Sequence, residues 1–155
     1  MFIKFRSDSR YTRQGFEAQW STSQGCYQNL TGNQGTLQSP NYPNYYYFGA
    51  DCVWKITTDP GTHVRLTFSA MSIYRTSGCT SDSVVIGDGN NSTNILGRVC
   101  GYEVPVPFIA TGNVMTVEFS SRASSTRRGF QARWSTNQGL DSFTNPLPLH
   151  IFVKI

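Results

Sequence analysis

Hydrophobic and polar residues alternate along several short segments of this sequence. Residues 52–56, 64–68, 115–119 and 130–134 each place apolar side chains at every second position. A strand with one buried face has this period of two. Residues 84–86 are a continuous apolar run, which is typical of a strand buried on both sides. We therefore predict strands over all of these segments.

Turn-forming residues separate these segments. Asp59–Gly61, Gly87–Asn91 and Thr111–Asn113 are rich in Gly, Asn, Asp and Pro. No segment has the 3.6-residue apolar spacing of a helix. Short strands joined by such turns predict an all-β fold, an antiparallel β-sandwich.

The chain contains an internal repeat. Met1–Gly25 matches Met115–Gly139 without a gap, with Phe16 and Trp20 in the places of Phe130 and Trp134. A fixed repeat of this kind indicates a modular protein. We expect the chain to open inside the last two strands of a preceding unit, so Met1 is not expected to be the natural start.

The repeat predicts the domain boundaries. Residues 1–22 are expected to be the end of the truncated preceding unit, and residues 23–25 a linker. Residues 26–136 form the complete unit, with a size normal for one domain. Residues 137–155 diverge after Gly139 and are expected to be a disordered tail.

Charge and hydropathy exclude two classes of partner. Charged residues make up only 14% of the chain and the net charge is +4, so no dense basic stripe of the nucleic-acid-binding kind is present. No apolar stretch is long enough to insert into a membrane, and the chain carries no signal peptide. We expect an extracellular protein whose signal sequence lies outside this chain.

The cysteines support that location. An even count of four, Cys26, Cys52, Cys79 and Cys100, suggests two disulfides and an oxidising compartment, although the spacing leaves all three pairings open. No C-x-x-C pair accompanies the distant His63 and His150, which excludes a zinc site, and we expect no metal or other cofactor. The glycosylation sequons lie at Asn29, Asn90 and Asn91.

Several motifs in order along the chain resemble those of the CUB domain family. They are G-N-Q-G-T-L-Q-S-P-N-Y-P at Gly32, C-x-W at Cys52, C-x-x-D-x-V at Cys79, L-G-x-x-C-G at Leu96 and G-F-x-A-x-W at Gly129. The resemblance implies a jelly-roll-like sandwich of two antiparallel sheets. It also implies disulfides that join Cys26 to Cys52 and Cys79 to Cys100.

Many members of that family hold a calcium ion at one end of the sandwich, where it orders loops that grip a basic side chain of a partner. The family's ligand positions fall on Tyr46, Tyr74, Asp82 and Arg122. Tyr74 and Arg122 replace two carboxylates, and calcium takes six to eight oxygens. We therefore expect no calcium at this end of the complete domain. In the partial first unit, by contrast, Asp8 keeps an aspartate at the position of Arg122.

A pairing hypothesis follows from these substitutions. The Arg122 guanidinium takes the place of the cation and forms a charge-assisted hydrogen bond with the Asp82 carboxylate. The alternative is that Arg122 extends into solvent. Arg75, Arg122, Arg127 and Arg128 are either a solvated surface or a site for an acidic partner, and the aromatic run at residues 42–48 is either packed or a binding patch.

No catalytic motif such as H-E-x-x-H or G-x-S-x-G is present, so we expect no enzyme activity. The sequence predicts a binding or adhesion module of a multi-CUB extracellular protein, with extracellular proteins or neighbouring CUB modules as partners. The alternatives are a substrate-positioning module of a secreted protease, and a glycan-binding CUB domain similar to spermadhesins.

Overall fold

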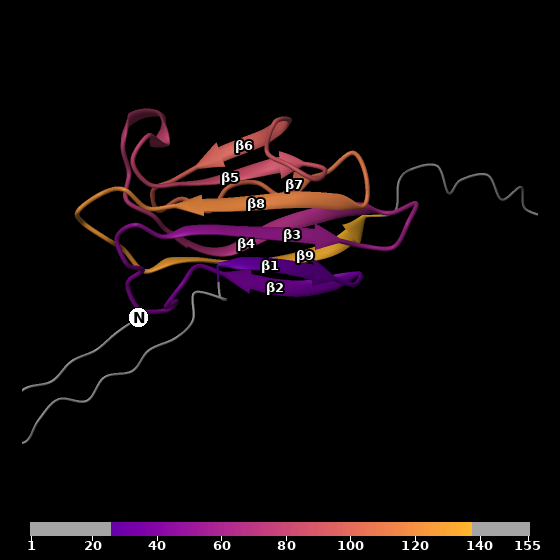
Figure 1. Ribbon diagram of the computed structural model, residues 1–155, viewed down its shortest axis with the longest axis horizontal. Helices are drawn as coiled ribbons and strands as arrows, with labels where there is room; N and C mark the ends of the chain where they lie inside the picture. The colour runs from indigo at the N-terminus through magenta and orange to yellow at the C-terminus, as the bar shows by residue number, and fades with distance from the viewer. Residues whose placement is uncertain (1–25, 138–155) are drawn as a thin grey trace, which may run out of the picture.

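The computed structural model describes residues 26–137, which form a sandwich of two β-sheets (Figure 1). The predictions about the partial first unit, the linker and the tail beyond residue 137 lie outside this range. One sheet has five strands in the order β1-β3-β8-β5-β6, and the other has four in the order β2-β9-β4-β7. The predicted all-β sandwich is confirmed.

The strands of the five-stranded sheet are β1 (Tyr27–Thr31), β3 (Asp51–Thr57), β5 (Ser83–Asp88), β6 (Ile95–Val99) and β8 (Val114–Ser120). Those of the four-stranded sheet are β2 (Gln34–Gln38), β4 (His63–Ser72), β7 (Phe108–Ile109) and β9 (Gly129–Asn137). A 3-10 turn, η2 (Ser77–Cys79), precedes β5.

Every strand predicted from alternation is present, and the predicted fully buried run lies in β5, whose first five residues are all buried. The sheets are not purely antiparallel, because β1 runs parallel to β3. The strands that the pattern did not indicate are β1, β2, β6 and β7. All of these are edge strands.

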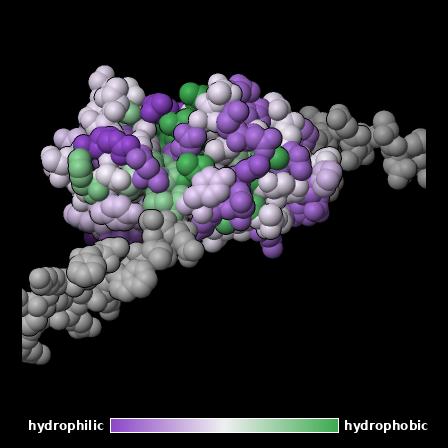
Figure 2. All heavy atoms as spheres, viewed as in Figure 1, coloured by the Kyte–Doolittle hydropathy of each residue, from purple (hydrophilic) through white to green (hydrophobic). Residues whose placement is uncertain are grey.

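The core lies between the two sheets and is rich in aromatic rings. Phe130 meets Trp54, Phe68 and Phe119 in edge-to-face contacts, with ring centroids 5.6 to 5.9 Å apart. Such pairs add about 0.5–1.5 kcal/mol each beyond the area they bury. On the face that Figure 2 shows, hydrophobic residues gather in a short band near the middle of the view, with more hydrophilic residues around it.

Two disulfides brace the sandwich. Cys26 is bonded to Cys52, which ties the residue before β1 to β3, and Cys79 is bonded to Cys100, which ties η2 to the residue after β6. Closing loops of this length stabilises the folded state by about 3 kcal/mol each in a chain-entropy picture. The described residues contain no free cysteine.

Candidate functional site

The residues at the family's calcium positions come together at one end of the sandwich. Tyr46 lies in the loop between β2 and β3, and Tyr74 follows β4. Asp82 immediately precedes β5, and Arg122 follows the end of β8. In Figure 1 this is the left-hand end, where β5 begins and β8 ends.

Asp82 is the buried centre of this end, with 0% of its surface exposed. Its Oδ1 accepts hydrogen bonds from the backbone N–H groups of Arg122 at 2.8 Å and Ala123 at 2.7 Å. Its Oδ2 accepts one from the Tyr46 hydroxyl at 2.6 Å. Bonds of this kind to a carboxylate are about twice as strong as neutral ones. Asp82 therefore joins the loop before β3 to the loop after β8.

Tyr46 extends this network. Its hydroxyl accepts a hydrogen bond from the backbone N–H of Tyr74 at 3.0 Å, and its own N–H donates to the Arg127 carbonyl at 2.9 Å. Its ring packs edge-to-face on Phe119, 5.1 Å away. Burial of the ring and the hydrogen bond to Asp82 raise the pKa of the Tyr46 phenol above its usual value. The phenol therefore stays protonated and remains a donor.

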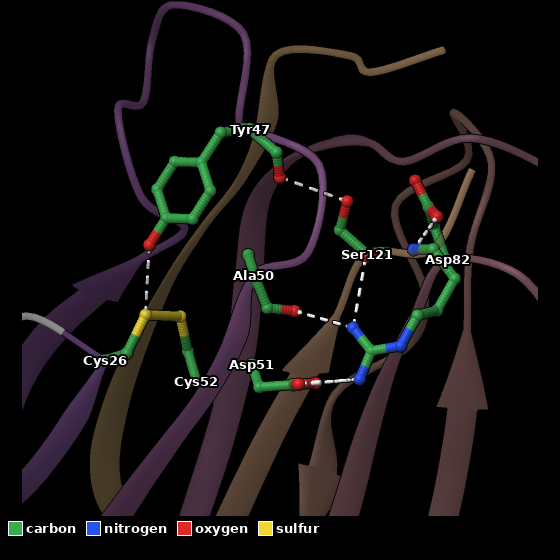
Figure 3. Close-up of polar contacts among 8 residues, drawn as sticks. Cys26, Tyr47, Ala50, Asp51, Cys52, Asp82 and Ser121 are labelled. Atoms are coloured by element: carbon green, nitrogen blue, oxygen red, sulfur yellow. Dashed lines mark hydrogen bonds and ion pairs between the residues drawn. A yellow bond between two sulfur atoms is a disulfide. The ribbon is translucent and has the colours of Figure 1, made fainter. Parts of the chain in front are cut away.

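The hypothesis that the Arg122 guanidinium pairs with Asp82 is wrong. Only the backbone N–H of Arg122 reaches Asp82, whereas its guanidinium forms a bidentate pair with Asp51 at 2.6 Å. The guanidinium also donates to the Ser121 carbonyl at 3.1 Å (Figure 3). The physical reason is desolvation: a guanidinium on the buried Asp82 would itself need burial, while the Arg122 and Asp51 side chains keep 50% and 63% exposure.

The fit of this end to calcium can be judged from its donors. Asp82 supplies a single carboxylate, and both of its oxygens already accept hydrogen bonds from the chain. The described residues contain no cluster of three or more His, Cys, Asp or Glu side chains suited to a metal ion. Calcium takes six to eight oxygen ligands, usually with several carboxylates among them, and of the four family positions only Asp82 carries a carboxylate.

Arginine and tyrosine side chains cover the outside of this end. The Arg127 guanidinium stacks over the Tyr74 ring, with 5.2 Å from Cζ to the ring centroid. Arg127 Nε also donates to the Tyr102 hydroxyl at 2.8 Å. Tyr102 joins Arg75 and Arg98 in lining a hollow of about 680 Å³ beside the Cys79–Cys100 disulfide. Sequence reasoning missed Tyr102 and Asp51, since no local pattern distinguishes either residue.

The aromatic run at residues 42–48 divides between the core and the surface. Tyr46 is buried at 1% exposure, whereas Tyr45, Tyr47 and Phe48 are exposed. The Tyr47 hydroxyl lies 3.4 Å from Cys26 Sγ (Figure 3). Only Tyr46 has the packed role, so the run as a whole is neither a core segment nor a uniform binding patch.

The sequon asparagines are all exposed. Asn29 lies on β1, and Asn90 and Asn91 lie in the turn between β5 and β6. The Asn91 side-chain oxygen accepts a hydrogen bond from the Thr93 hydroxyl. His63, at the start of β4, places Nδ1 3.2 Å from the Ala110 carbonyl oxygen. These residues lie apart from the network around Asp82.

Comparison with known sequences decides the family. The sequence model of the CUB domain matches residues 26–134, which is most of the chain. The chain belongs to the CUB domain family. The family match thus covers nearly the same residues as the β-sandwich. Within the described range, no helix is long and apolar enough to cross a membrane.

Curated relatives of this CUB domain are much longer proteins. Tolloid-like protein 1 of Mus musculus is 37% identical over 135 residues, which are 86% of this chain and 13% of the relative. Cubilin of Rattus norvegicus is 36% identical over 138 residues, which are 88% of this chain and 4% of the relative. The chain therefore spans only a small part of the relatives it matches.

Solved structures show the same fold. The extracellular region of zebrafish Gpr126/Adgrg6 aligns with a TM-score of 0.65 and 32% identity, over 73% of this chain and 15% of that one. The MASP-1 CUB2 domain bound to Ca2+ aligns with a TM-score of 0.62 and 28% identity, over 69% of this chain and 96% of that one.

Proposed function

We propose that residues 26–137 are a non-catalytic, protein-binding CUB domain of an extracellular multi-domain protein, and that this domain works without calcium. Its two disulfides suit an oxidising compartment. The relatives that it matches are larger proteins, of which it covers a small fraction. The internal repeat supports a preceding CUB unit that ends near residue 22, followed directly by this domain.

The hydrogen bonds of Asp82 are the observation that carries this proposal. A calcium-loaded site orders its loops by drawing several carboxylates to one ion. Here the loops on either side are held by donors of the chain itself, namely the Tyr46 hydroxyl and the N–H groups of Arg122 and Ala123. The loop end is thereby ordered without an ion and is available to a partner.

Calcium titration tests the proposal. The full chain, secreted from an oxidising host, should give no binding heat with calcium at millimolar concentration. Its melting temperature should be the same in calcium and in EDTA. The double substitution Arg122→Asp with Tyr74→Glu returns carboxylates to two ligand positions, and it should create a melting temperature that rises with calcium. Millimolar or tighter calcium binding by the unaltered chain would overturn the proposal.

A second candidate function is substrate positioning within a secreted protease. It is favoured by the similarity to Tolloid-like protein 1 and to "Bone morphogenetic protein 1" of Xenopus laevis, the latter 33% identical over 135 residues. Its loop end would then hold a protein substrate instead of an adhesion partner. Sequencing the flanking exons discriminates the two, because a catalytic domain in the same reading frame is required only by the protease alternative.

A further inference from the structure

The arginines and tyrosines on the loop end form a continuous surface. Arg127 connects Tyr74, by stacking, with Tyr102, by a hydrogen bond. Tyr102 continues into the hollow that Arg75 and Arg98 also line. We name these five residues the Arg–Tyr surface: Tyr74, Arg75, Arg98, Tyr102 and Arg127.

This surface is held rigidly before any partner arrives. One wall of the hollow is η2, which the Cys79–Cys100 disulfide joins to the end of β6. The Thr76 hydroxyl fixes the same turn by accepting hydrogen bonds from the N–H groups of Thr80 at 3.0 Å and Ser81 at 3.2 Å. The Arg127 side chain is fixed by its stacking and its hydrogen bond. Preorganised side chains lose less entropy on binding.

The three arginines give this surface a positive charge, although Arg98 also lines a second hollow with Asp51 and Glu118. Arg98 donates to the Ser83 hydroxyl, a neutral group, and Arg127 meets only neutral tyrosines and a backbone carbonyl. Among the residues that line the hollow, Glu103 is the single acidic side chain. Arginine guanidinium groups match carboxylates bidentately, so a partner carrying carboxylates suits this surface.

Apolar residues also line the hollow and favour a protein partner. Val99, Val104 and Pro105 line it, and Val104 is 51% exposed. Tyrosine and arginine are also the residues most enriched at the energetic centres of protein–protein interfaces. A peptide can place an apolar side chain against these residues beside an acidic one.

We propose that the Arg–Tyr surface binds an acidic segment of a partner protein, in which Asp or Glu residues alternate with apolar ones. The inference rests on the proposed protein-binding function and names its partner class. It also reverses the sign expected from the family, whose calcium-ordered loops grip a basic side chain. The carboxylates lie against Arg75, Arg98 and Arg127, and the apolar side chain lies against Val104 and Pro105.

The test uses fluorescence anisotropy with the full chain and two short labelled peptides. In one peptide Glu alternates with Leu, and in the other Lys replaces Glu. The Glu peptide should bind, with an affinity that falls as sodium chloride rises, and the Lys peptide should not bind. The affinity for the Glu peptide should be the same in calcium and in EDTA. If the peptide fails to bind, the calcium titration still tests calcium independence separately.

Single substitutions locate the site. Arg127→Gln and Arg75→Gln should each lower the affinity for the Glu peptide about tenfold, as expected for the loss of a partly desolvated charge pair. Tyr102→Phe keeps the ring but removes the hydroxyl that holds Arg127, so the loss of affinity should be smaller than that of Arg127→Gln. Arg65→Gln is the matched control, because Arg65 lies on β4 and lines a different hollow. Its effect should stay below about twofold.

Three results would overturn the proposal. The first is no binding of the Glu peptide at low salt. The second is an equal loss with Arg65→Gln and Arg127→Gln, which would mean attraction by net charge alone. The third is a heparin oligosaccharide that displaces the Glu peptide and whose binding depends on Arg127 more strongly than binding of the Glu peptide does. That result would assign the surface to a sulfated glycan. Melting curves of each variant show whether it is folded.

Discussion

Replacing Tyr46 by phenylalanine tests whether the loop end is held together from within. The change removes one hydroxyl and keeps the ring against Phe119. That hydroxyl makes two hydrogen bonds, one donated to Asp82 Oδ2 at 2.6 Å and one accepted from the Tyr74 N–H at 3.0 Å. Asp82 Oδ2 then loses the one hydrogen-bond donor that residues 26–137 give it, while staying buried.

The loss of folding stability follows from these contacts. A hydrogen bond to a charged group contributes about 1.5–3 kcal/mol, and a buried group left unsatisfied costs about as much. The Tyr74 N–H is only partly buried, so water replaces some of its lost bond. We expect Tyr46→Phe to lower the free energy of unfolding by roughly 3 kcal/mol. That is a large part of the 5–15 kcal/mol typical of a domain and corresponds to a melting temperature lower by roughly 10 °C.

Urea denaturation and thermal melting measure the effect, with Tyr45→Phe as the control. Tyr45 is the adjacent residue and is 59% exposed, so the loss of its hydroxyl should change stability by less than about 0.5 kcal/mol. In a double-mutant cycle with Asp82→Asn, the two losses should not add, because both break the same bond. A Tyr46→Phe variant as stable as the Tyr45→Phe control would refute the argument, and so would a loss that calcium restores.

Three further changes follow from the same structure. Asp51→Ala should cost less than about 1 kcal/mol in urea denaturation, because the pair with Arg122 is exposed to solvent; a loss as large as that of Tyr46→Phe would contradict this. Gly35→Ala should cost about 1–3 kcal/mol in the same assay, since the added Cβ would collide with the Trp134 ring; unchanged stability would show that the ring can move. Because the pKa of Tyr46 is raised, the folded state keeps a proton that the unfolded state loses near pH 10. The contribution of Tyr46 to stability is therefore full below that pH and falls above it by about 1.4 kcal/mol per pH unit. In urea denaturation at alkaline pH, Tyr46→Phe should remove this part of the decline.

The central strands could be predicted from the sequence, and the edge strands could not. Strands β3, β4, β8 and β9 each bury one face in the core, and selection of apolar residues for that face produces the period of two. Strands β1, β2, β6 and β7 have a neighbour on one side only. Their side chains are more exposed, as in β1, where no residue is fully buried, so apolar residues do not mark one face at every second position.

The candidate site was predicted in its backbone but not in its side-chain pairing. The family positions predict that Tyr46, Asp82 and Arg122 lie at one end, and in the structure the Tyr46 hydroxyl and the Arg122 N–H both donate to Asp82. The partner of the Arg122 guanidinium depends instead on strand register, because Asp51 pairs with Ser120 two residues before Arg122. That register brings the two charged side chains together on the surface. It cannot be read from residues 51 and 122 in a single sequence.

The loop end thus contains two separate groups of side chains, one buried and one exposed, and their separation has a consequence for binding. Asp82 and the Tyr46 hydroxyl lie inside and order the loops, whereas Arg75, Tyr102 and Arg127 lie outside and carry the charge that a partner would meet. The two are connected through the backbone, because the Arg127 carbonyl accepts the Tyr46 N–H and the Tyr74 N–H donates to the Tyr46 hydroxyl. A substitution inside should therefore weaken stability and binding together. A substitution outside should weaken binding alone, and neither loss should depend on the concentration of calcium.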